Sequence, residues 1–66
     1  MENTFLDRLK IEKDELLYKV TKLAMFLNSD KVIELSDANE LLLKQQLEAM
    51  NTYLDILIIR IELLEK

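Results

Sequence analysis

Hydrophobic residues recur at helical spacing over two long stretches of this 66-residue chain. Spacings of three and four residues place apolar side chains on one face of an α-helix. In the first stretch, about residues 4–28, this face comprises Phe5, Leu9, Leu16, Val20, Leu23 and Leu27, widened by Leu6, Leu17 and Ala24. In the second, about residues 37–65, a heptad repeat comprises Leu43, Leu47, Met50, Leu54, Leu57, Ile61 and Leu64. The pattern predicts two long helices.

The segment NSDKVIELSD separates the two stretches. Its asparagine, serine and aspartate side chains cap helices and compete with helical hydrogen bonds. Ser36 is the expected N-cap of the second helix, with Asp37 and Glu40 in the first turn, where negative charge suits the helix dipole. A short turn or helix over about residues 30–35 is expected to close the connection.

These elements predict an all-α fold, a single antiparallel two-helix hairpin covering residues 1–66. The chain contains no glycine and no proline, the residues that most often make tight turns and end helices. Without cysteine or histidine, neither a disulfide nor an ordinary zinc site can stabilise it. A domain of this size buries only about 60% of its unfolded surface. We therefore expect neighbouring copies to supply further burial.

The segment YLDILIIRI, residues 53–61, is apolar on more sides than one partner helix can cover. At about 100° per residue, its apolar arc is roughly twice the stripe of about 100° that a single partner covers. Contiguous apolar surface of this kind marks interfaces. The heptad seam is expected to face the first helix, and Ile56, Ile58 or Ile59 to face neighbouring chains. The hairpin is thus predicted to assemble into a homo-oligomeric bundle, of which a dimeric four-helix bundle is one form.

Composition argues against several function classes. The net charge of −4 disfavours duplex DNA and anionic membranes, which require a basic surface. The N-terminus lacks the pattern of a signal peptide, and no apolar run approaches a membrane-spanning length, so we expect a cytoplasmic protein. The chain has no His, no Cys, no phosphate loop and no G-x-S-x-G sequence, so we expect no catalytic residue, metal site, cofactor or enzymatic activity. A mutase-like helical enzyme acting on anions would need several clustered arginines, and the chain has only Arg8 and Arg60.

Two polar residues lie inside the apolar arc of the second helix. Tyr53 and Arg60 fall at about 60° and 40° from Ile56, and Gln46 extends their line. A guanidinium in an interface needs an anion, a carboxylate or an aromatic face. Two alternatives follow: either Arg60 pairs with a glutamate of a neighbouring subunit while Tyr53 packs, or they contact a bound phosphate.

Cationic and aromatic residues share one face of the first helix. The face comprises Phe5, Arg8, Glu12, Glu15, Lys19, Lys22 and Phe26. Nucleotides require cations for phosphate and flat apolar groups for the base. The alternative is a solvated surface with Phe5 anchoring the helix start. Ion pairs four residues apart would belong to such a surface, namely Arg8 with Glu12, Lys10 with Asp14, and Glu15 with Lys19.

Three segments carry a family resemblance: FLDRL, DELLYKVTKLAMFL and LLLKQQLEAMNTYLDILIIRI. Together they resemble small phage proteins of the anti-CBASS cyclic-oligonucleotide sponge family, whose helical hairpin is shared with the N-terminal part of anti-Thoeris sponges. The resemblance implies a homohexamer in the host cytoplasm that binds cyclic di- or trinucleotide immune messengers without cleaving them. The alternative is a structural or adaptor helical-bundle protein of a phage, without a small-molecule ligand.

The resemblance also implies roles for individual residues. In such sponges an aromatic side chain near the N-terminus stacks on a base, which corresponds to Phe5, although a tyrosine there would add a hydroxyl. A lysine farther along the first helix contacts a phosphate, which corresponds to Lys19 or Lys22. An arginine of the second helix lines a separate trinucleotide pocket at the symmetry axis of the oligomer, which corresponds to Arg60. With Arg8 and Tyr53, these are the candidate ligand-binding residues.

Overall fold

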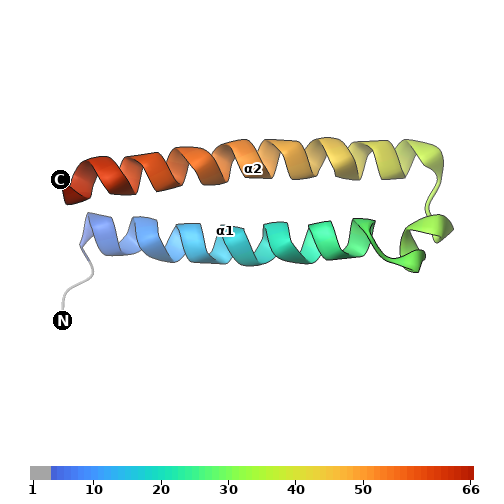
Figure 1. Ribbon diagram of the computed structural model, residues 1–66, viewed down its shortest axis with the longest axis horizontal. Coiled ribbons are helices and arrows are strands. Elements are labelled where there is room, and N and C mark those ends of the chain that lie inside the picture. The colour runs from blue at the N-terminus through green and yellow to red at the C-terminus, as the bar shows by residue number, and fades with distance from the viewer. Residues whose placement is uncertain (1–3) are drawn as a thin grey trace.

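The computed structural model describes residues 4–66 as two long antiparallel helices lying side by side (Figure 1). Helix α1 spans Phe5–Leu27, the 3-10 helix η1 spans Asp30–Glu34, and helix α2 spans Asp37–Glu65. No strand occurs in this part of the chain. The predicted all-α helical hairpin is therefore confirmed, whereas its assembly into a bundle stays a prediction. The expected domain also includes residues 1–3, which lie outside the described residues.

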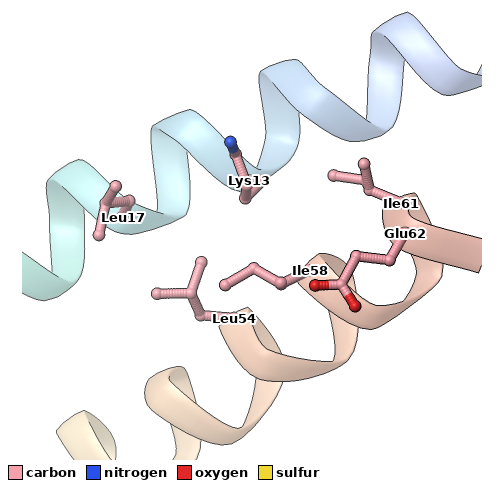
Figure 2. Close-up of a pocket in the computed structure, with 6 residues that line it drawn as sticks. All are labelled: Lys13, Leu17, Leu54, Ile58, Ile61 and Glu62. Atoms are coloured by element: carbon pink, nitrogen blue, oxygen red, sulfur yellow. The ribbon is translucent and has the colours of Figure 1, made fainter. Parts of the chain in front are cut away.

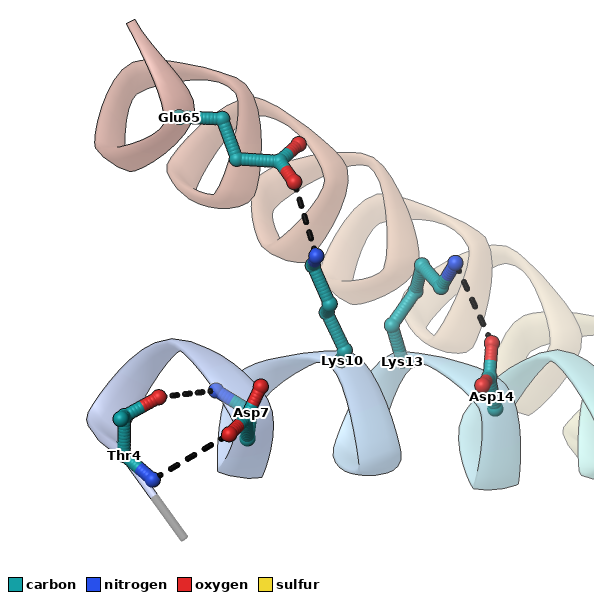
Figure 3. A network of polar contacts seen from close by, with 6 residues as sticks. All are labelled: Thr4, Asp7, Lys10, Lys13, Asp14 and Glu65. Carbon is teal, nitrogen blue, oxygen red and sulfur yellow. Dashed lines mark hydrogen bonds and ion pairs between the residues drawn. The ribbon is translucent and has the colours of Figure 1, made fainter. Parts of the chain in front are cut away.

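Both ends of α1 are closed by cap residues. Thr4 Oγ1 accepts a hydrogen bond from the Asp7 backbone N–H at 3.0 Å, and the Thr4 N–H donates to Asp7 Oδ2 at 3.4 Å (Figure 3). This reciprocal pair forms a capping box, which satisfies backbone groups that the first turn leaves unpaired. Asn28 closes the other end, where its backbone N–H donates to the carbonyl of Ala24 at 3.2 Å. The helix itself is therefore one residue shorter at each end than the expected 4–28.

Serines organise the connection between the helices. Ser29 caps η1 by accepting from the Lys31 N–H, and Ser36 Oγ accepts from the Asn39 N–H at 3.2 Å. The predicted N-cap at Ser36 is confirmed, with Asp37 in the first turn of α2. No residue of 4–66 has a positive φ angle. The chain therefore reverses direction without the left-handed conformation that favours glycine.

Removing the Ser36 cap is expected to destabilise the hairpin by about 1 kcal/mol. In the Ser36→Ala variant the Asn39 N–H loses its acceptor at the start of α2. The midpoint of urea unfolding, followed by far-ultraviolet circular dichroism, should fall. Ser36→Asp keeps an acceptor oxygen and should unfold near the wild-type midpoint. Equal losses in both variants would contradict a capping role.

The core is a single seam between α1 and α2. Its buried members are Leu9, Leu16, Val20, Leu54, Leu57 and Ile61, with Leu6, Leu47 and Met50 packed against them. All of these residues belong to the two predicted apolar faces. Not every member of these faces enters the seam, because Phe5 is 57% exposed and Leu64 is 49% exposed at the helix ends and Leu17 is 47% exposed beside the seam. A two-helix hairpin covers only a narrow stripe of each helix, so its terminal turns lack neighbours on most sides.

Much apolar surface remains outside this seam. Ile56, Ile58 and Ile59 are exposed, as the wide apolar arc of α2 predicts. A second uncovered stripe, Ile11, Tyr18 and Met25, recurs every seven residues along α1. Within residues 4–66, neither helix combines the length and the apolar character that crossing a membrane requires. The hairpin therefore has more apolar surface than its own fold buries.

Candidate ligand-binding face

The hairpin has two broad faces, one on each side of the plane that contains both helix axes (Figure 1). Phe5 and Arg60 meet across the helices on one of them, which we call the Arg60 face. Lys13 and Leu17 of α1 lie across from Ile58 and Glu62 of α2 on the other, which we call the groove face. At about 100° per residue, Arg60 and Ile58 fall on opposite sides of the buried seam of α2. The two faces are therefore chemically separate.

Arg60 stacks on Phe5 at the open end of the hairpin. The guanidinium carbon lies 5.8 Å from the centre of the ring, within the range of a cation–π interaction. Both side chains are exposed, and Arg60 takes part in no salt bridge among residues 4–66. A guanidinium held against a ring still presents its N–H donors in its own plane. The pair therefore places an anion-binding group beside an exposed aromatic surface.

The contact differs from what the family resemblance implies for these two residues. Separate pockets were expected for Phe5 and Arg60, whereas the hairpin holds them together within one chain. Sequence periodicity alone does not reveal the contact, because it depends on how the two helices are aligned along their axes. The sequence does give one indication of the contact, because Phe5 and Arg60 each lie at one edge of the apolar face of their helix.

The other candidates lie along the same face but farther apart. Taking Phe5 as zero, Arg8 and Lys19 fall at about 300° and 320° around α1, and Tyr53 lies within about 20° of Arg60 around α2. Lys19 is fourteen residues beyond Phe5, or about 21 Å along the axis. One compact ligand stacked on Phe5 therefore does not reach Lys19 of the same chain.

Lys22 is turned toward a different neighbour. Its ammonium nitrogen lies 5.4 Å from the ring centre of Tyr18, which is an exposed member of the outer apolar stripe of α1. Lys22 therefore lies at the border between the Arg60 face and that stripe. Tyr18 was not among the predicted site residues. Its spacing of four residues from Lys22 is the sequence signal for the contact.

The groove face carries a cavity of about 310 Å³ between the helices (Figure 2). Its lining consists of Lys13, Leu17, Leu54, Ile58, Ile61 and Glu62. The four aliphatic side chains form the walls, and the two charged residues come from opposite helices (Figure 2). None of the predicted ligand-binding residues lines this cavity.

The ion pairs differ from those expected. Among residues 4–66 they join Lys10 to Glu65 at 2.8 Å, Lys13 to Asp14 at 3.1 Å and Lys44 to Glu40 at 2.9 Å. The three expected pairs within the first helix do not form. Lys10 reaches across to α2 instead of pairing with Asp14, because its position beside the seam brings the carboxylate of Glu65 within reach (Figure 3). No group of acidic side chains in the described part of the chain gathers to hold a metal ion.

Known protein families include one that matches this hairpin. A family model described as Sequestin matches residues 3–63, which is nearly the whole chain. The chain belongs to the Sequestin family. Membership confirms the resemblance to a sponge family, and the name Sequestin denotes sequestration of a ligand. Neither a search of curated proteins nor one of solved structures gives a match.

One ion pair gives the stability of the hairpin a dependence on pH. The hydrogen bond from Lys10 to Glu65, followed by the charge of that carboxylate, raises the pKa of Lys10 above its ordinary value of 10.5. A raised folded-state pKa means that the pair stabilises the hairpin fully below pH 10.5 and is lost as pH rises through the higher folded value. The raised pKa of Lys10 therefore places the loss of its contribution in alkaline solution.

We expect the Glu65→Gln variant to show less alkaline destabilisation than the wild type. Thermal midpoints of the two proteins should be measured from about pH 8 to about pH 12. Near pH 8 the wild type should unfold at a higher temperature than Glu65→Gln. Near pH 12 the two midpoints should be equal, because deprotonated Lys10 no longer pairs with Glu65. Residue 65 is the single difference between the two chains, so the rest of the sequence is common to both. A gap that stays constant across the range would contradict this linkage.

Proposed function

We propose that this protein is a phage anti-defence sponge, which binds cyclic di- or trinucleotide immune messengers in the host cytoplasm and sequesters them without cleavage. Membership of the Sequestin family supports ligand sequestration. The stacked pair of Phe5 and Arg60 is the observation that supports a nucleotide ligand. It joins an exposed ring, which can stack on a base, to a guanidinium that has no carboxylate partner among residues 4–66.

A cyclic oligonucleotide matches this pair in both of its chemical parts. Its bases are flat and apolar on their faces, and base stacking on an aromatic side chain contributes about 1–3 kcal/mol. Its phosphodiester groups accept hydrogen bonds, and the fork of an arginine is suited to phosphate oxygens. Because the net charge of the chain is −4, long-range attraction does not gather an anionic ligand, and binding depends on local cations.

A complete site is proposed to include residues from more than one chain. Lys19 lies about 21 Å along α1 from Phe5, too far for one compact ligand to bridge within a single copy. Homo-oligomerisation brings the cations of one chain to the ring of another, and the resemblance implies a hexamer. The exposed Ile56 and Ile59 on α2 provide apolar surface for this assembly. The protein is proposed to bind without turnover and to need no cofactor.

Calorimetric titration with a panel of cyclic di- and trinucleotides tests the proposal. At least one member should bind, and ligand released by heating should run unchanged on chromatography. Absence of binding across the panel would overturn the proposal. Recovery of a linear or hydrolysed product would replace the sponge with an enzyme.

A second candidate function is a structural or adaptor bundle without a small-molecule ligand. It is favoured by the uncovered stripe of Ile11, Tyr18 and Met25, which lies on α1 away from the seam and resembles a docking surface for another helix. Alanine variants at Lys19 and Arg60 discriminate between the two functions. Loss of nucleotide binding with an unchanged oligomer supports the sponge, and loss of the oligomer in a protein that binds nothing supports the bundle.

A further inference from the structure

Two contacts join the helices at the open end of the hairpin, one on each side of the seam. On one side Arg60 stacks on Phe5. On the other, Lys10 Nζ contacts Glu65 Oε2 at 2.8 Å (Figure 3). Arg60 and Glu65 lie about 140° apart around α2, with the fully buried Leu57 between them. The ion pair therefore lies on the other side of the hairpin from the proposed ligand-binding pair.

The two contacts incline in opposite senses along the hairpin. Phe5 precedes Lys10 by five residues on α1, and Arg60 precedes Glu65 by five on α2, which is about 7.5 Å of helix in each case. Because the helices are antiparallel, Phe5 and Glu65 lie nearest the open end, whereas Lys10 and Arg60 lie deeper (Figure 1). The stack therefore pulls α2 toward the open end, and the ion pair pulls α2 toward the connection between the helices.

These opposed attractions set the position of the guanidinium on the ring. The capping box of Thr4 and Asp7 fixes the start of α1, where Phe5 lies, so a shift is expected in the end of α2. The guanidinium carbon of Arg60 lies 5.8 Å from the ring centre, close to the outer limit of about 6 Å for a cation–π interaction. At this distance the face of the ring is left open to a base.

The ion pair affects alignment more than stability. The side chains of Lys10 and Glu65 are 43% and 47% exposed, and exposed pairs of this kind contribute little to folding. Glu65 is also the last residue of α2, where the helix dipole disfavours an acidic side chain. The pair nevertheless joins two helices, unlike the pair of Lys44 with Glu40 within α2. Its main consequence is therefore the position of one helix end relative to the other.

We propose that Lys10 and Glu65 are positioning residues for the ligand-binding pair. Their ion pair draws α2 back along α1 and keeps the guanidinium of Arg60 from closing onto the ring of Phe5. The ring then offers its face to a base, while the guanidinium offers N–H donors to the neighbouring phosphate. This role rests on the proposed function, but the alignment that it requires is measurable in the protein without ligand.

Nuclear magnetic resonance without ligand tests this alignment. An aromatic ring shifts protons above its face upfield, so the Arg60 Hδ resonance, referenced to the Phe5→Leu variant, reports how far the side chain covers the ring. Loss of the ion pair releases α2 toward the ring, so this upfield shift should increase in Glu65→Gln. Glu40→Gln is the matched control, because it removes the ion pair with Lys44 near the start of α2, and it should leave the shift unchanged. An unchanged or smaller upfield shift in Glu65→Gln would overturn the proposal.

Calorimetry with the same panel of cyclic di- and trinucleotides tests the effect on binding. Each member that binds the wild type should bind Glu65→Gln about twofold to fivefold more weakly, as the small energies of exposed ion pairs allow. In the Phe5→Leu background, Glu65→Gln should weaken binding no further, because the ion pair acts through the stack. Equal losses in the two backgrounds would show that Glu65 acts independently of the ring and would overturn its positioning role.

Exchange of the two charges provides a rescue. The double variant with Lys10→Glu and Glu65→Lys restores attraction between the same positions, so the Arg60 resonance and the affinity should both return toward wild-type values. Failure of both to return would overturn the proposal. So would a lower urea midpoint in Glu65→Gln with an unmoved Arg60 resonance, which is the result of a merely stabilising pair. If no panel member binds the wild type, the proposed function fails, whereas the resonance still decides whether the ion pair positions Arg60.

Discussion

Replacing Leu57 with alanine is expected to unfold the hairpin. The side chain of Leu57 is 0% exposed, and it is the only large side chain among residues 4–66 that is fully buried. Truncating a buried leucine costs about 2–5 kcal/mol, because the surroundings do not close around the cavity. At about 0.05–0.15 kcal/mol per residue, the entire stability of so short a chain is on the order of 3–10 kcal/mol. The loss is therefore comparable with the whole free energy of unfolding.

Far-ultraviolet circular dichroism and urea titration measure this effect. Leu57→Ala should lose most of its helical signal, or unfold at a much lower urea concentration, at every protein concentration tested. Leu41→Ala is the matched control, since Leu41 is 57% exposed and the same atoms are removed. Its free energy of unfolding should change by no more than about 0.5 kcal/mol. A wild-type midpoint for Leu57→Ala would show that the seam is not the core.

Removing the guanidinium of Arg60 is expected to weaken cyclic-nucleotide binding about 10-fold to 100-fold. Hydrogen bonds to charged groups contribute about 1.5–3 kcal/mol, and each 1.4 kcal/mol is a factor of ten in affinity. Arg60→Gln keeps a polar side chain but removes the charge. Lys31→Gln is the matched control, because it removes one positive charge from η1, which connects the helices at the other end of the hairpin (Figure 1).

A second variant, Phe5→Leu, tests whether the ring and the guanidinium act together in binding. The substitution keeps an apolar side chain but removes the ring on which Arg60 stacks. Calorimetry on the two single variants and the double variant gives the coupling energy between ring and guanidinium. Additive losses would indicate that ligand contacts the two groups independently. Affinity unchanged in all three variants would remove this pair from the site.

The seam of the hairpin was predictable from sequence because burial in a helix pair follows periodicity. The heptad positions of α2 identified Leu54, Leu57 and Ile61, and all three are buried. The excess apolar arc likewise predicted the exposure of Ile56 and Ile59. These inferences need only the angle between residues of one helix, which the regular geometry of the α-helix supplies.

Contacts between the helices were not predictable in the same way. The stacking of Arg60 on Phe5, the bridge from Lys10 to Glu65 and the cavity of the groove face depend on how far one helix is shifted along the other. That shift is set by the length of the connection and by side-chain packing across the seam. Periodicity therefore identified which residues share a face of one helix, but it did not pair them across the two helices.

The position of the stacked pair of Phe5 and Arg60 at the open end of the hairpin has a consequence for hydrogen exchange. Phe5 and Arg60 are separated by most of the chain. The entropic cost of bringing two residues together increases with the length of chain between them, so this contact is costly to form. Helix ends also open locally at low free-energy cost. The backbone amides around this site are therefore expected to exchange with solvent faster than those in the middle of the two helices. A ligand that joins the two helix ends should slow exchange in both, including at amides that it does not contact.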